Sequence, residues 1–210
     1  MALIALTTDP GLGPQSVVTS NRDFKAGGTA ILIRDGDPEQ LKADATECNS
    51  GYDLCVGRVF RDHRNEYGQE LGEEDKIALL PGNAVIIQTQ EWIEFPERRF
   101  GQIFPKVSLL QKGIANTPSK VDPGFRGNLL ITVFNYGKRK EFLCRGQRFC
   151  SLHVFNVEGP VRPYEKPPPT IGARRSAGWQ QKFGDWIDRN GARVSIVTAV
   201  ATVLVLLLRG

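Results

Sequence analysis

The sequence is poor in the residues that build zinc centres and catalytic triads. It has only two histidines, His63 and His153. With so few, a histidine-based zinc site or a Ser-His-Asp triad would be difficult to assemble. The four cysteines form neither a CxxC pair nor a dense disulfide frame, which indicates a reducing compartment. We therefore expect ordinary surface or core histidines and no zinc.

The sequence also lacks a concentrated basic surface and a leader segment. Its net charge is only +4, from 27 Lys and Arg against 23 Asp and Glu. No stripe of Lys and Arg interleaved with aromatic residues appears, so we expect no nucleic acid as a partner. The start, MALIAL, has a short apolar run without preceding basic residues. It is a poor signal peptide and is expected to form a first strand or an arm.

Turn-forming residues, in contrast, are abundant. The 210 residues include 22 Gly and 13 Pro, which separate short apolar runs such as AILI, AVII and LLITVF. Short strands at regular spacing, with Gly and Pro between them, are typical of a β-barrel or a β-sandwich. We therefore predict an all-β domain over residues 1–158. No internal repeat and no long amphipathic helix is found in this part.

The composition changes after the β region. Residues 159–178 are rich in Pro, Gly and Arg and are predicted to form an extended tail or linker. Residues 179–191, WQQKFGDWIDRNG, place aromatic side chains at helical spacing, which predicts a short amphipathic helix beside a membrane. Residues 192–209 contain the uncharged run VSIVTAVATVLVLLL and are predicted to form a transmembrane helix.

That uncharged run is short for a membrane span. About 15 residues make ~22 Å of helix, whereas the hydrocarbon core of a bilayer is ~30 Å thick. The alternative is a buried core helix. We favour a single-pass C-terminal anchor because the run is apolar on every face, follows a linker and lies between Arg193 and Arg209. A lipid bilayer is then a partner, with the β domain in the cytoplasm.

Three short motifs occur in order within the β region. They are SGYDL at 50–54, VDPGFRGN at 121–128 and RGQRF at 145–149. With the stretch LLPGNAVIIQTQEWIEFPERRFGQIFPKVSLLQKGI between the first two, this set resembles the dCTP deaminase and trimeric dUTPase superfamily over roughly residues 40–158. The resemblance implies a jelly-roll-like β-barrel and a homotrimer with nucleotide sites shared between subunits. It also implies a pyrimidine deoxynucleotide as ligand, with Mg²⁺ bound together with the triphosphate.

The motif VDPGFRGN suits a nucleotide pocket. Gly124 and Gly127 let the backbone approach a ligand closely. The resemblance gives Asp122 the role of the general base that activates water in dUTPases, and it places Phe125 against the deoxyribose. Arg126 matches the family pattern as well. From the residues alone, Asp-Pro-Gly also makes an ordinary turn.

The residues of the deaminase reaction are replaced at three positions. Ungapped alignment puts Thr132 where deaminating members carry a proton-shuttling glutamate, and a hydroxyl cannot replace a carboxylate there. In PKVSLLQKG, Lys106 and Ser108 remain, but Val107 replaces a serine and Gln111 replaces an arginine. The zinc-deaminase signature, His-x-Glu with Pro-Cys-x-x-Cys, is missing.

The residues of the dUTPase reaction are better preserved, although the Gly-rich last motif is not visible. The tail PYEKPPPTIGARR resembles the deaminase segment that folds over the phosphates. The alternative is a solvated linker with basic residues near an anionic membrane, and both interpretations stay open. The candidate nucleotide-binding residues are Asp53, Lys106, Ser108, Gln111, Asp122, Phe125, Arg126, Gln147, Tyr164 and Lys166.

Two classes of function stay open. The first is a membrane-anchored protein that binds a pyrimidine deoxynucleoside triphosphate, has lost catalysis and acts as a nucleotide sensor or effector. It is favoured because pocket-shaping residues remain while catalytic ones are replaced. The second is an active dUTP diphosphatase or dCTP deaminase tethered to a membrane, which the retained Asp122 supports. A purely structural trimer would leave VDPGFRG unexplained.

Overall fold

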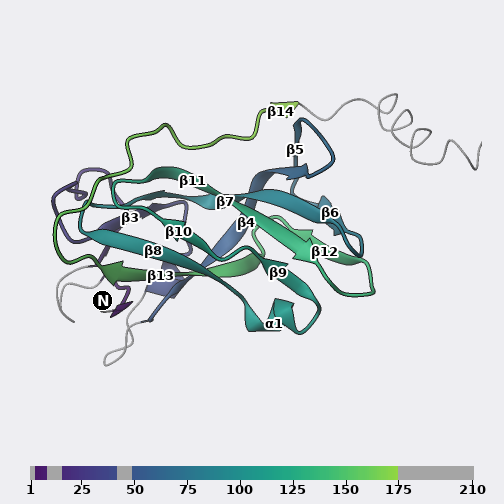
Figure 1. The fold of residues 1–210 in the computed structure, drawn as a ribbon, viewed down its shortest axis with the longest axis horizontal. Helices are drawn as coiled ribbons and strands as arrows, with labels where there is room; N and C mark the ends of the chain where they lie inside the picture. The colour runs from purple at the N-terminus through teal and green to yellow at the C-terminus, as the bar shows by residue number, and fades with distance from the viewer. Residues whose placement is uncertain (1–2, 9–15, 42–48, 175–210) are drawn as a thin grey trace, which may run out of the picture. The chain divides into compact units, whose positions relative to one another are not determined.

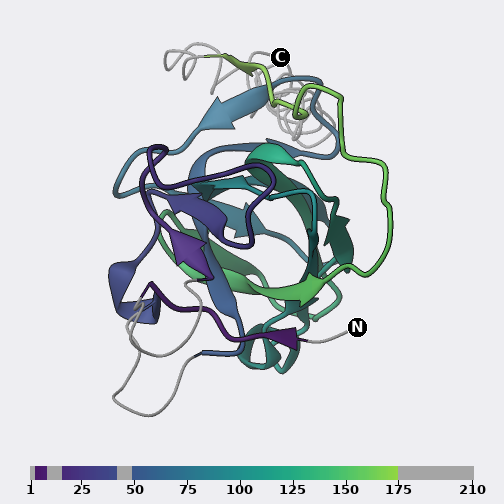
Figure 2. The same ribbon diagram turned by 90° about the vertical axis from the view of Figure 1, so that its left-hand side faces the viewer.

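The computed structural model describes residues 3–8, 16–41 and 49–174. Nearly all regular structure there is β-strand, and the helical content of these residues is one α-helical turn, α1 (Val107–Leu110), and one 3-10 turn (Pro38–Leu41) (Figure 1). The predicted all-β class is therefore confirmed. Viewed from the side, the strands curve around a common core (Figure 2).

The main sheet has a central path of seven strands, in the order β10-β8-β13-β4-β7-β11-β9. Their bounds are β4 (Tyr52–Asp62), β7 (Ala84–Glu94), β8 (Arg99–Pro105), β9 (Ile114–Asn116), β10 (Ser119–Val121), β11 (Arg126–Asn135) and β13 (Arg148–Asn156). The pairs along this path are antiparallel. Consecutive strands are often not neighbours, so residues distant in sequence are brought side by side.

Shorter strands extend this sheet. Strand β1 (Leu3–Ile4) pairs with β13, β3 (Ile31–Arg34) pairs with β7 and with β2 (Val17–Val18), and β5 (Gly68–Glu70) pairs with β4. Strands β6 (Lys76–Leu79) and β12 (Glu141–Cys144) form a separate antiparallel two-stranded sheet. Strand β14 (Ala173–Arg174) is the last described element.

Strand β11 shows how the sequence pattern builds the barrel. Buried and partly exposed residues alternate along it, as in any strand with one face on a core. Leu129, Ile131 and Val133 belong to the hydrophobic core. Thr132 lies between the last two, so its side chain is on the opposite, partly exposed face. The hydroxyl in the middle of LLITVF is therefore outside the core.

A β-bulge interrupts the sheet where β4, β7 and β11 meet. The register of β11 against β7 shifts at Asn128, whose side-chain amide donates to the carbonyls of Thr89 and Glu91 at 3.1 and 3.0 Å. On β4, a Cβ at Gly57 would lie 2.5 Å from the carbonyl oxygen of Gln88, so only glycine fits. The bulge interrupts the regular ladder of hydrogen bonds, and the Asn128 amide donates to backbone carbonyls that this interruption leaves without a ladder donor.

The segment 157–172 contains no strand or helix and lies on the barrel surface. After β13 it runs over the barrel to the side of β5 (Figure 1). The amide of Tyr164 donates to the carbonyl of Pro123 at 2.7 Å, and the amide of Gly68 donates to the carbonyl of Gly172 at 2.9 Å. We call this segment the tail. Both of its halves are thus hydrogen-bonded to the barrel.

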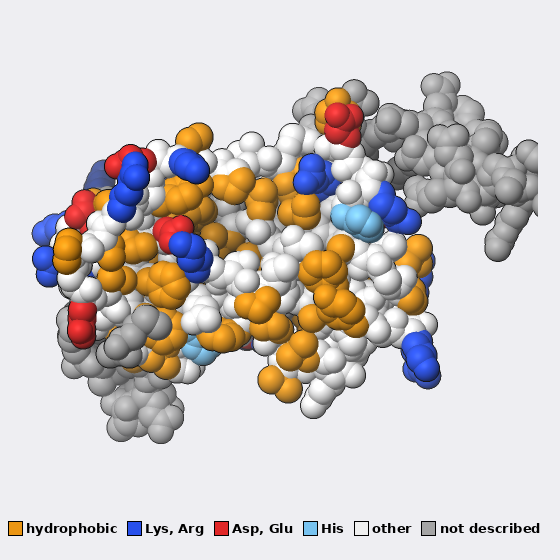
Figure 3. Space-filling model, in the orientation of Figure 1, with side chains coloured by type: hydrophobic (Ala, Val, Ile, Leu, Met, Phe, Trp, Pro, Cys, Tyr) orange, Lys and Arg blue, Asp and Glu red, His pale blue; other side chains and the backbone are white. Residues whose placement is uncertain are grey.

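Apolar side chains gather on the surface over α1 and β9 (Figure 3). Val107 and Leu110 of α1 are 68% and 45% exposed, and Tyr136 is 72% exposed. The amide of Tyr136 donates to the carbonyl of Gly113, just after α1, at 2.8 Å. These three residues form the surface that we call the α1 patch.

Among the described residues, no helix combines the length and the apolar character needed to cross a membrane. The amphipathic helix predicted at 179–191 and the transmembrane helix predicted at 192–209 lie outside the described residues. Both remain predictions.

Candidate functional site

Nine of the ten candidate nucleotide-binding residues fall into two groups at opposite ends of β8. Val121, next to Asp122, pairs with Gly101 near the start of β8. Lys106 follows Pro105 at the end of the same strand, after roughly 16 Å of extended chain. The turn group consists of Asp122, Phe125, Tyr164 and Lys166. The helix group consists of Asp53, Lys106, Ser108, Gln111 and Gln147.

The turn group is built around the Pro-Gly turn that precedes β11. The amide of Phe125 donates to the carbonyl of Asp122 at 3.1 Å, and Gly124 has a φ of +76°. This left-handed conformation is available to glycine without strain. The turn directs the Phe125 ring into the core, where it is only 6% exposed.

The tail covers this turn. The Tyr164 ring packs on Phe125, with ring centroids 5.6 Å apart at an interplanar angle of 55°. A Cβ at Gly124 would lie 3.0 Å from the Cβ of Pro163, and one at Gly127 would lie 2.7 Å from the Cβ of Pro168. The glycines that the sequence analysis related to a ligand thus also accommodate the chain's own tail.

Asp122 lies at the surface of the turn group. Its carboxylate forms a 2.7 Å ion pair with Lys120, and both side chains are accessible to solvent. Exposed pairs of this kind contribute little to stability, typically about 0–1 kcal/mol. The carboxylate therefore stays available to a ligand or a water molecule. Lys166 is exposed as well, so this group offers charges of both signs.

In the helix group, Asp53 and Lys106 neutralise each other. The Lys106 ammonium forms an ion pair with the Asp53 carboxylate, which also accepts a 2.5 Å hydrogen bond from the Ser151 hydroxyl. The Gln40 side chain holds the Asp53 backbone through its amide and its carbonyl, at 3.0 and 2.8 Å. The sequence analysis identified neither Ser151 nor Gln40, because neither lies in a recognised motif.

The other members of the helix group differ in how they are held. Ser108 and Gln111, in α1 and directly after it, are exposed to solvent. Gln147 accepts a 3.0 Å hydrogen bond from the Cys144 amide through its side chain, and its backbone carbonyl accepts one from Val56 at 2.9 Å. Gln147 therefore stabilises the turn between β12 and β13, whereas Ser108 and Gln111 face outward.

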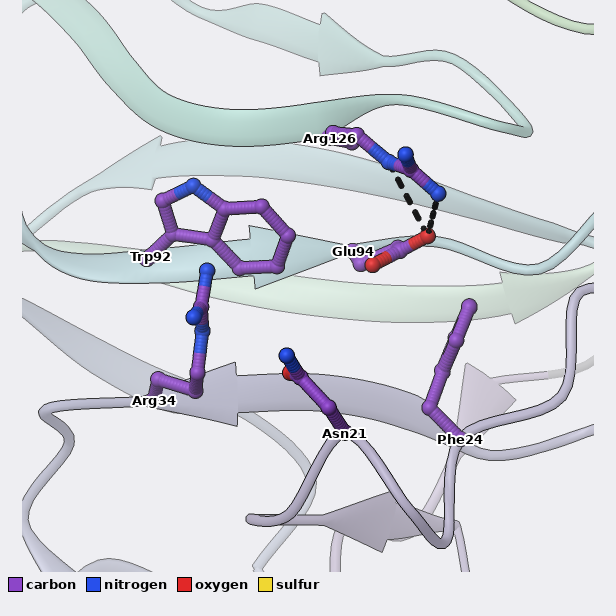
Figure 4. Close-up of a pocket in the computed structure, with 6 residues that line it drawn as sticks. All are labelled: Asn21, Phe24, Arg34, Trp92, Glu94 and Arg126. Atoms are coloured by element: carbon purple, nitrogen blue, oxygen red, sulfur yellow. Dashed lines mark hydrogen bonds and ion pairs between the residues drawn. The ribbon is translucent and has the colours of Figure 1, made fainter.

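Arg126 belongs to neither group. Its guanidinium donates to the Glu94 carboxylate through Nε at 3.1 Å and through a terminal nitrogen at 2.5 Å. The Glu94 side chain is largely buried. This ion pair lies on the outer face of the barrel and lines a pocket there (Figure 4). The chain thus directs Phe125 and Arg126, adjacent in sequence, to opposite faces.

Thr132 is far from the turn group. It lies six residues along β11 from Arg126, where the strand begins, which is about 20 Å at ~3.3 Å per residue. Small-molecule pockets of up to ~1,000 Å³ are about 10 Å across. One pocket on a single chain therefore cannot contain both Asp122 and Thr132.

A buried carboxylate that the sequence analysis did not identify lies between β4 and β7. Both carboxylate oxygens of Glu91 accept from the Cys55 amide at 3.1 Å, and one also accepts from the Tyr52 hydroxyl at 3.3 Å. Burial raises the pKa of Glu91, and burial together with Glu91 raises the pKa of Cys55 to about 12. Its only sequence signal was a Glu within a strand-forming run.

No cluster of three or more His, Cys, Asp or Glu side chains suitable for a metal ion occurs among the described residues. The carboxylates of the two groups, Asp53 and Asp122, are each paired with a lysine.

Comparisons with known proteins agree with the motifs. A family model described as dCTP deaminase-like matches residues 25–157. The chain is 33% identical over 135 residues to the dCTP deaminase of Pyrococcus furiosus, covering 64% of this chain and 81% of that protein. It is 33% identical over 119 residues to a probable deoxyuridine 5'-triphosphate nucleotidohydrolase of Methanothermobacter thermautotrophicus, covering 52% and 79%.

Solved structures include similar chains. The native EIAV dUTPase superimposes with a TM-score of 0.45 at 25% sequence identity, over 65% of this chain and 97% of that one. A dCTP deaminase from Agrobacterium tumefaciens gives a TM-score of 0.46 at 15% identity, over 58% of this chain and 43% of that one.

Proposed function

This chain belongs to the dCTP deaminase-like family, and we propose that it binds a pyrimidine deoxynucleoside triphosphate without deaminating it. The ligand class follows from the relatives, which are named as dCTP deaminases and as a probable dUTP nucleotidohydrolase. In this proposal the protein is a homotrimer anchored to a membrane, and it acts as a nucleotide sensor or effector.

The separation of the two groups of candidate residues is the observation that carries this proposal. The turn group offers Asp122 and Lys166, while the helix group offers the exposed Ser108 and Gln111. If the turn group of one copy faces the helix group of another, a complete pocket forms at the interface. A closed ring of three copies would then hold three equivalent sites.

The α1 patch supports assembly at the helix group. Val107, Leu110 and Tyr136 are large apolar side chains that are exposed in one chain. Clustered exposed apolar side chains often mark a protein interface. Burying this patch against a second copy would place Ser108 and Gln111 at the edge of the interface, where a shared ligand would lie.

The proposed loss of deamination rests on the residue type at position 132, where this chain has a threonine. A residue that relays protons between water and the leaving ammonia must titrate near neutral pH, and a threonine hydroxyl does not. Its side chain lies on the partly exposed face of β11, so a second copy could reach it. The missing chemistry is therefore a matter of residue type rather than of access.

The ligand would be held mainly by the turn group. Phe125 is covered by Tyr164, so contact between the sugar and the Phe125 ring requires the tail to move. Lys166 lies two residues further along the tail and would follow it onto the phosphates. Mg²⁺ would bind with the triphosphate, through phosphate oxygens and water.

The retained Asp122 favours one alternative, an active dUTP diphosphatase. Its carboxylate is accessible and is paired only with the exposed Lys120, so it has room to orient an attacking water molecule. In this alternative the protein would release dUMP and pyrophosphate from dUTP at the membrane, with the β domain in the cytoplasm.

One experiment separates these functions. The full chain is incubated with dCTP, dUTP, dTTP and dATP in turn, with Mg²⁺, and unfolding temperature and products are both followed. At a ligand concentration of about 100 Kd, binding stabilises the fold by about 2.7 kcal/mol, which raises Tm by roughly 5–10 °C for a chain of this size.

The proposal predicts such a shift with a pyrimidine nucleotide, a smaller one with dATP, and no ammonia from dCTP. Asp122→Asn serves as the matched variant, because it keeps the shape of the side chain but removes the base. Release of pyrophosphate from dUTP that Asp122→Asn abolishes would establish the diphosphatase instead. No shift with any of the four nucleotides would contradict both functions.

A further inference from the structure

A pocket on the outer face of the barrel is separate from both groups (Figure 4). We call it the outer pocket. Its volume is about 370 Å³, within the range of ~300–1,000 Å³ that is common for small-molecule sites. Its lining residues are Asn21, Phe24, Arg34, Trp92, Glu94 and Arg126.

The strand register explains why these side chains meet. Arg34 on β3 is paired with Trp92 on β7, and Glu94 on β7 is paired with Arg126 on β11. Successive residues of a strand point to opposite faces. Ile93, between Trp92 and Glu94, is in the core, so its two neighbours point outward. The loop after β2 supplies the other wall (Figure 4).

Arg34 is the unusual member of this pocket. Its guanidinium carbon lies 3.6 Å from the centroid of the Trp92 ring, which is a cation–π contact. Its Nε is buried and has no hydrogen-bond acceptor among the described residues. Arg34 is therefore held against Trp92, and no anionic partner of its guanidinium occurs among the described residues.

The other charges of the pocket cancel. Arg126 and Glu94 form an ion pair. Of the charged side chains that line the pocket, Arg34 is the one whose charge no other lining residue neutralises. A planar guanidinium with parallel N–H donors matches a carboxylate or a phosphate group. The aromatic rings of Trp92 and Phe24 provide apolar surface beside it. Asn21, on the exposed loop, adds an amide donor and an acceptor.

We propose that the outer pocket binds a small organic oxyanion, a carboxylate or a phosphate carried on a planar ring. Arg34 binds the oxyanion, Phe24 and the accessible part of Trp92 pack against the ring, and Asn21 donates a hydrogen bond to the ligand. This site is distinct from the nucleotide site of the proposed function, because the Phe125 side chain points to the core and Arg126 points to the outer face.

Trp92 is a built-in reporter for this site. The sequence contains three tryptophans, and replacing Trp179 and Trp186 by phenylalanine in the full chain leaves Trp92 alone. This parent is titrated with phenyl phosphate, benzoate, inorganic phosphate and, as the uncharged ring, phenol. We expect saturable changes in Trp92 fluorescence with phenyl phosphate or benzoate, binding at least tenfold weaker with inorganic phosphate, and none with phenol.

The charge dependence is tested at two positions. Arg34→Gln should weaken binding of the ring-bearing anion at least tenfold, while Arg61→Gln should leave it unchanged. Arg61 is a suitable control because its Nε is also buried and has no hydrogen-bond partner in the described part of the chain, and it does not line the pocket. Asn21→Asp should weaken binding by a similar factor, and Asn21→Lys should tighten it.

The pair of variants at Asn21 keeps the test decisive if Arg34→Gln does not fold. Asn21 is exposed, so neither substitution disturbs the core. Weaker binding in Asn21→Asp together with tighter binding in Asn21→Lys would support an anion site. If Asn21 had a purely structural role, the sign of the introduced charge would not reverse the effect on affinity. The proposal is overturned if none of the three anions gives a saturable change, or if Asn21→Asp and Asn21→Lys bind phenyl phosphate and benzoate equally well.

Discussion

The contact between Tyr164 and Phe125 predicts how firmly the tail is held. Tyr164→Ala removes a ring that covers Phe125 at a centroid distance of 5.6 Å. It leaves the 2.7 Å hydrogen bond from the backbone amide to Pro123 intact. The substitution therefore tests side-chain packing alone. Full burial of a large apolar side chain contributes about 1.5–3 kcal/mol, and Tyr164 is only partly buried.

We therefore expect the substitution to weaken the attachment of the tail by about 1.4 kcal/mol, just below that range, because the ring is only partly buried. Since 1.4 kcal/mol is a factor of about ten in an equilibrium constant, the open population of the tail should rise about tenfold. Local opening of this kind is measured directly by amide hydrogen exchange. The amides of Tyr164 and Gly68 report on the first and the second half of the tail, because each forms a hydrogen bond between the tail and the barrel.

The matched control is Phe142→Ala, which removes a half-exposed aromatic ring that contacts Lys140 and lies outside the tail, the turn group and the α1 patch. It should leave exchange at Tyr164 and Gly68 unchanged. If exchange at Tyr164 in Tyr164→Ala stays within about twofold of the parent, the ring does not hold the tail and the packing argument fails. A rise at Tyr164 without one at Gly68 would mean that the two halves open independently.

Three further predictions concern the nucleotide site and the core. Thr132→Glu alone should not restore ammonia release from dCTP, because Val107 and Gln111 still replace a serine and an arginine; measurable pocket-dependent turnover would contradict this. A bound pyrimidine nucleotide should slow proteolytic cleavage within 160–172, and equal cleavage rates with and without every nucleotide tested would exclude a nucleotide-responsive tail. Burial raises the pKa of Glu91 above the unfolded value of about 4.3. The contribution of the protonated Glu91 carboxyl to folding stability is therefore complete below about pH 4.3 and is lost as pH rises through the pKa of the folded protein. Glu91→Gln, which cannot ionise, should therefore gain stability relative to the parent as pH rises above about 4.3 in urea unfolding, and a difference that is independent of pH would refute this.

Part of the candidate site could be predicted from sequence because its motifs are local. SGYDL, VDPGFRGN and RGQRF are short and ordered, and each specifies a turn or a strand start by its own residues. The separation into a turn group and a helix group could not be predicted in this way. It depends on which strands pair with β8, and those pairings join residues far apart in the chain.

Long-range contacts also determine the charges that the site presents. Asp53 and Lys106 both match motif positions, but they are 53 residues apart in sequence and become an ion pair only in the fold. Ser151 joins them from β13 across 98 residues. No local pattern indicates that two candidate ligand-binding charges neutralise each other. The same holds for Arg34 and Trp92, which only the pairing of β3 with β7 brings together.

The sequence by itself determined the all-β class, because Gly and Pro separated apolar runs too short for helices. It also determined the family, through the ordered motifs. Only the tertiary structure decided that Thr132 faces outward, that the tail packs on the VDPGFRGN turn and that Glu91 is buried without a cation partner among the described residues. The physical reason is that facing, packing and burial depend on strand register and on contacts between distant segments, whereas turns and strand periodicity are set by neighbouring residues.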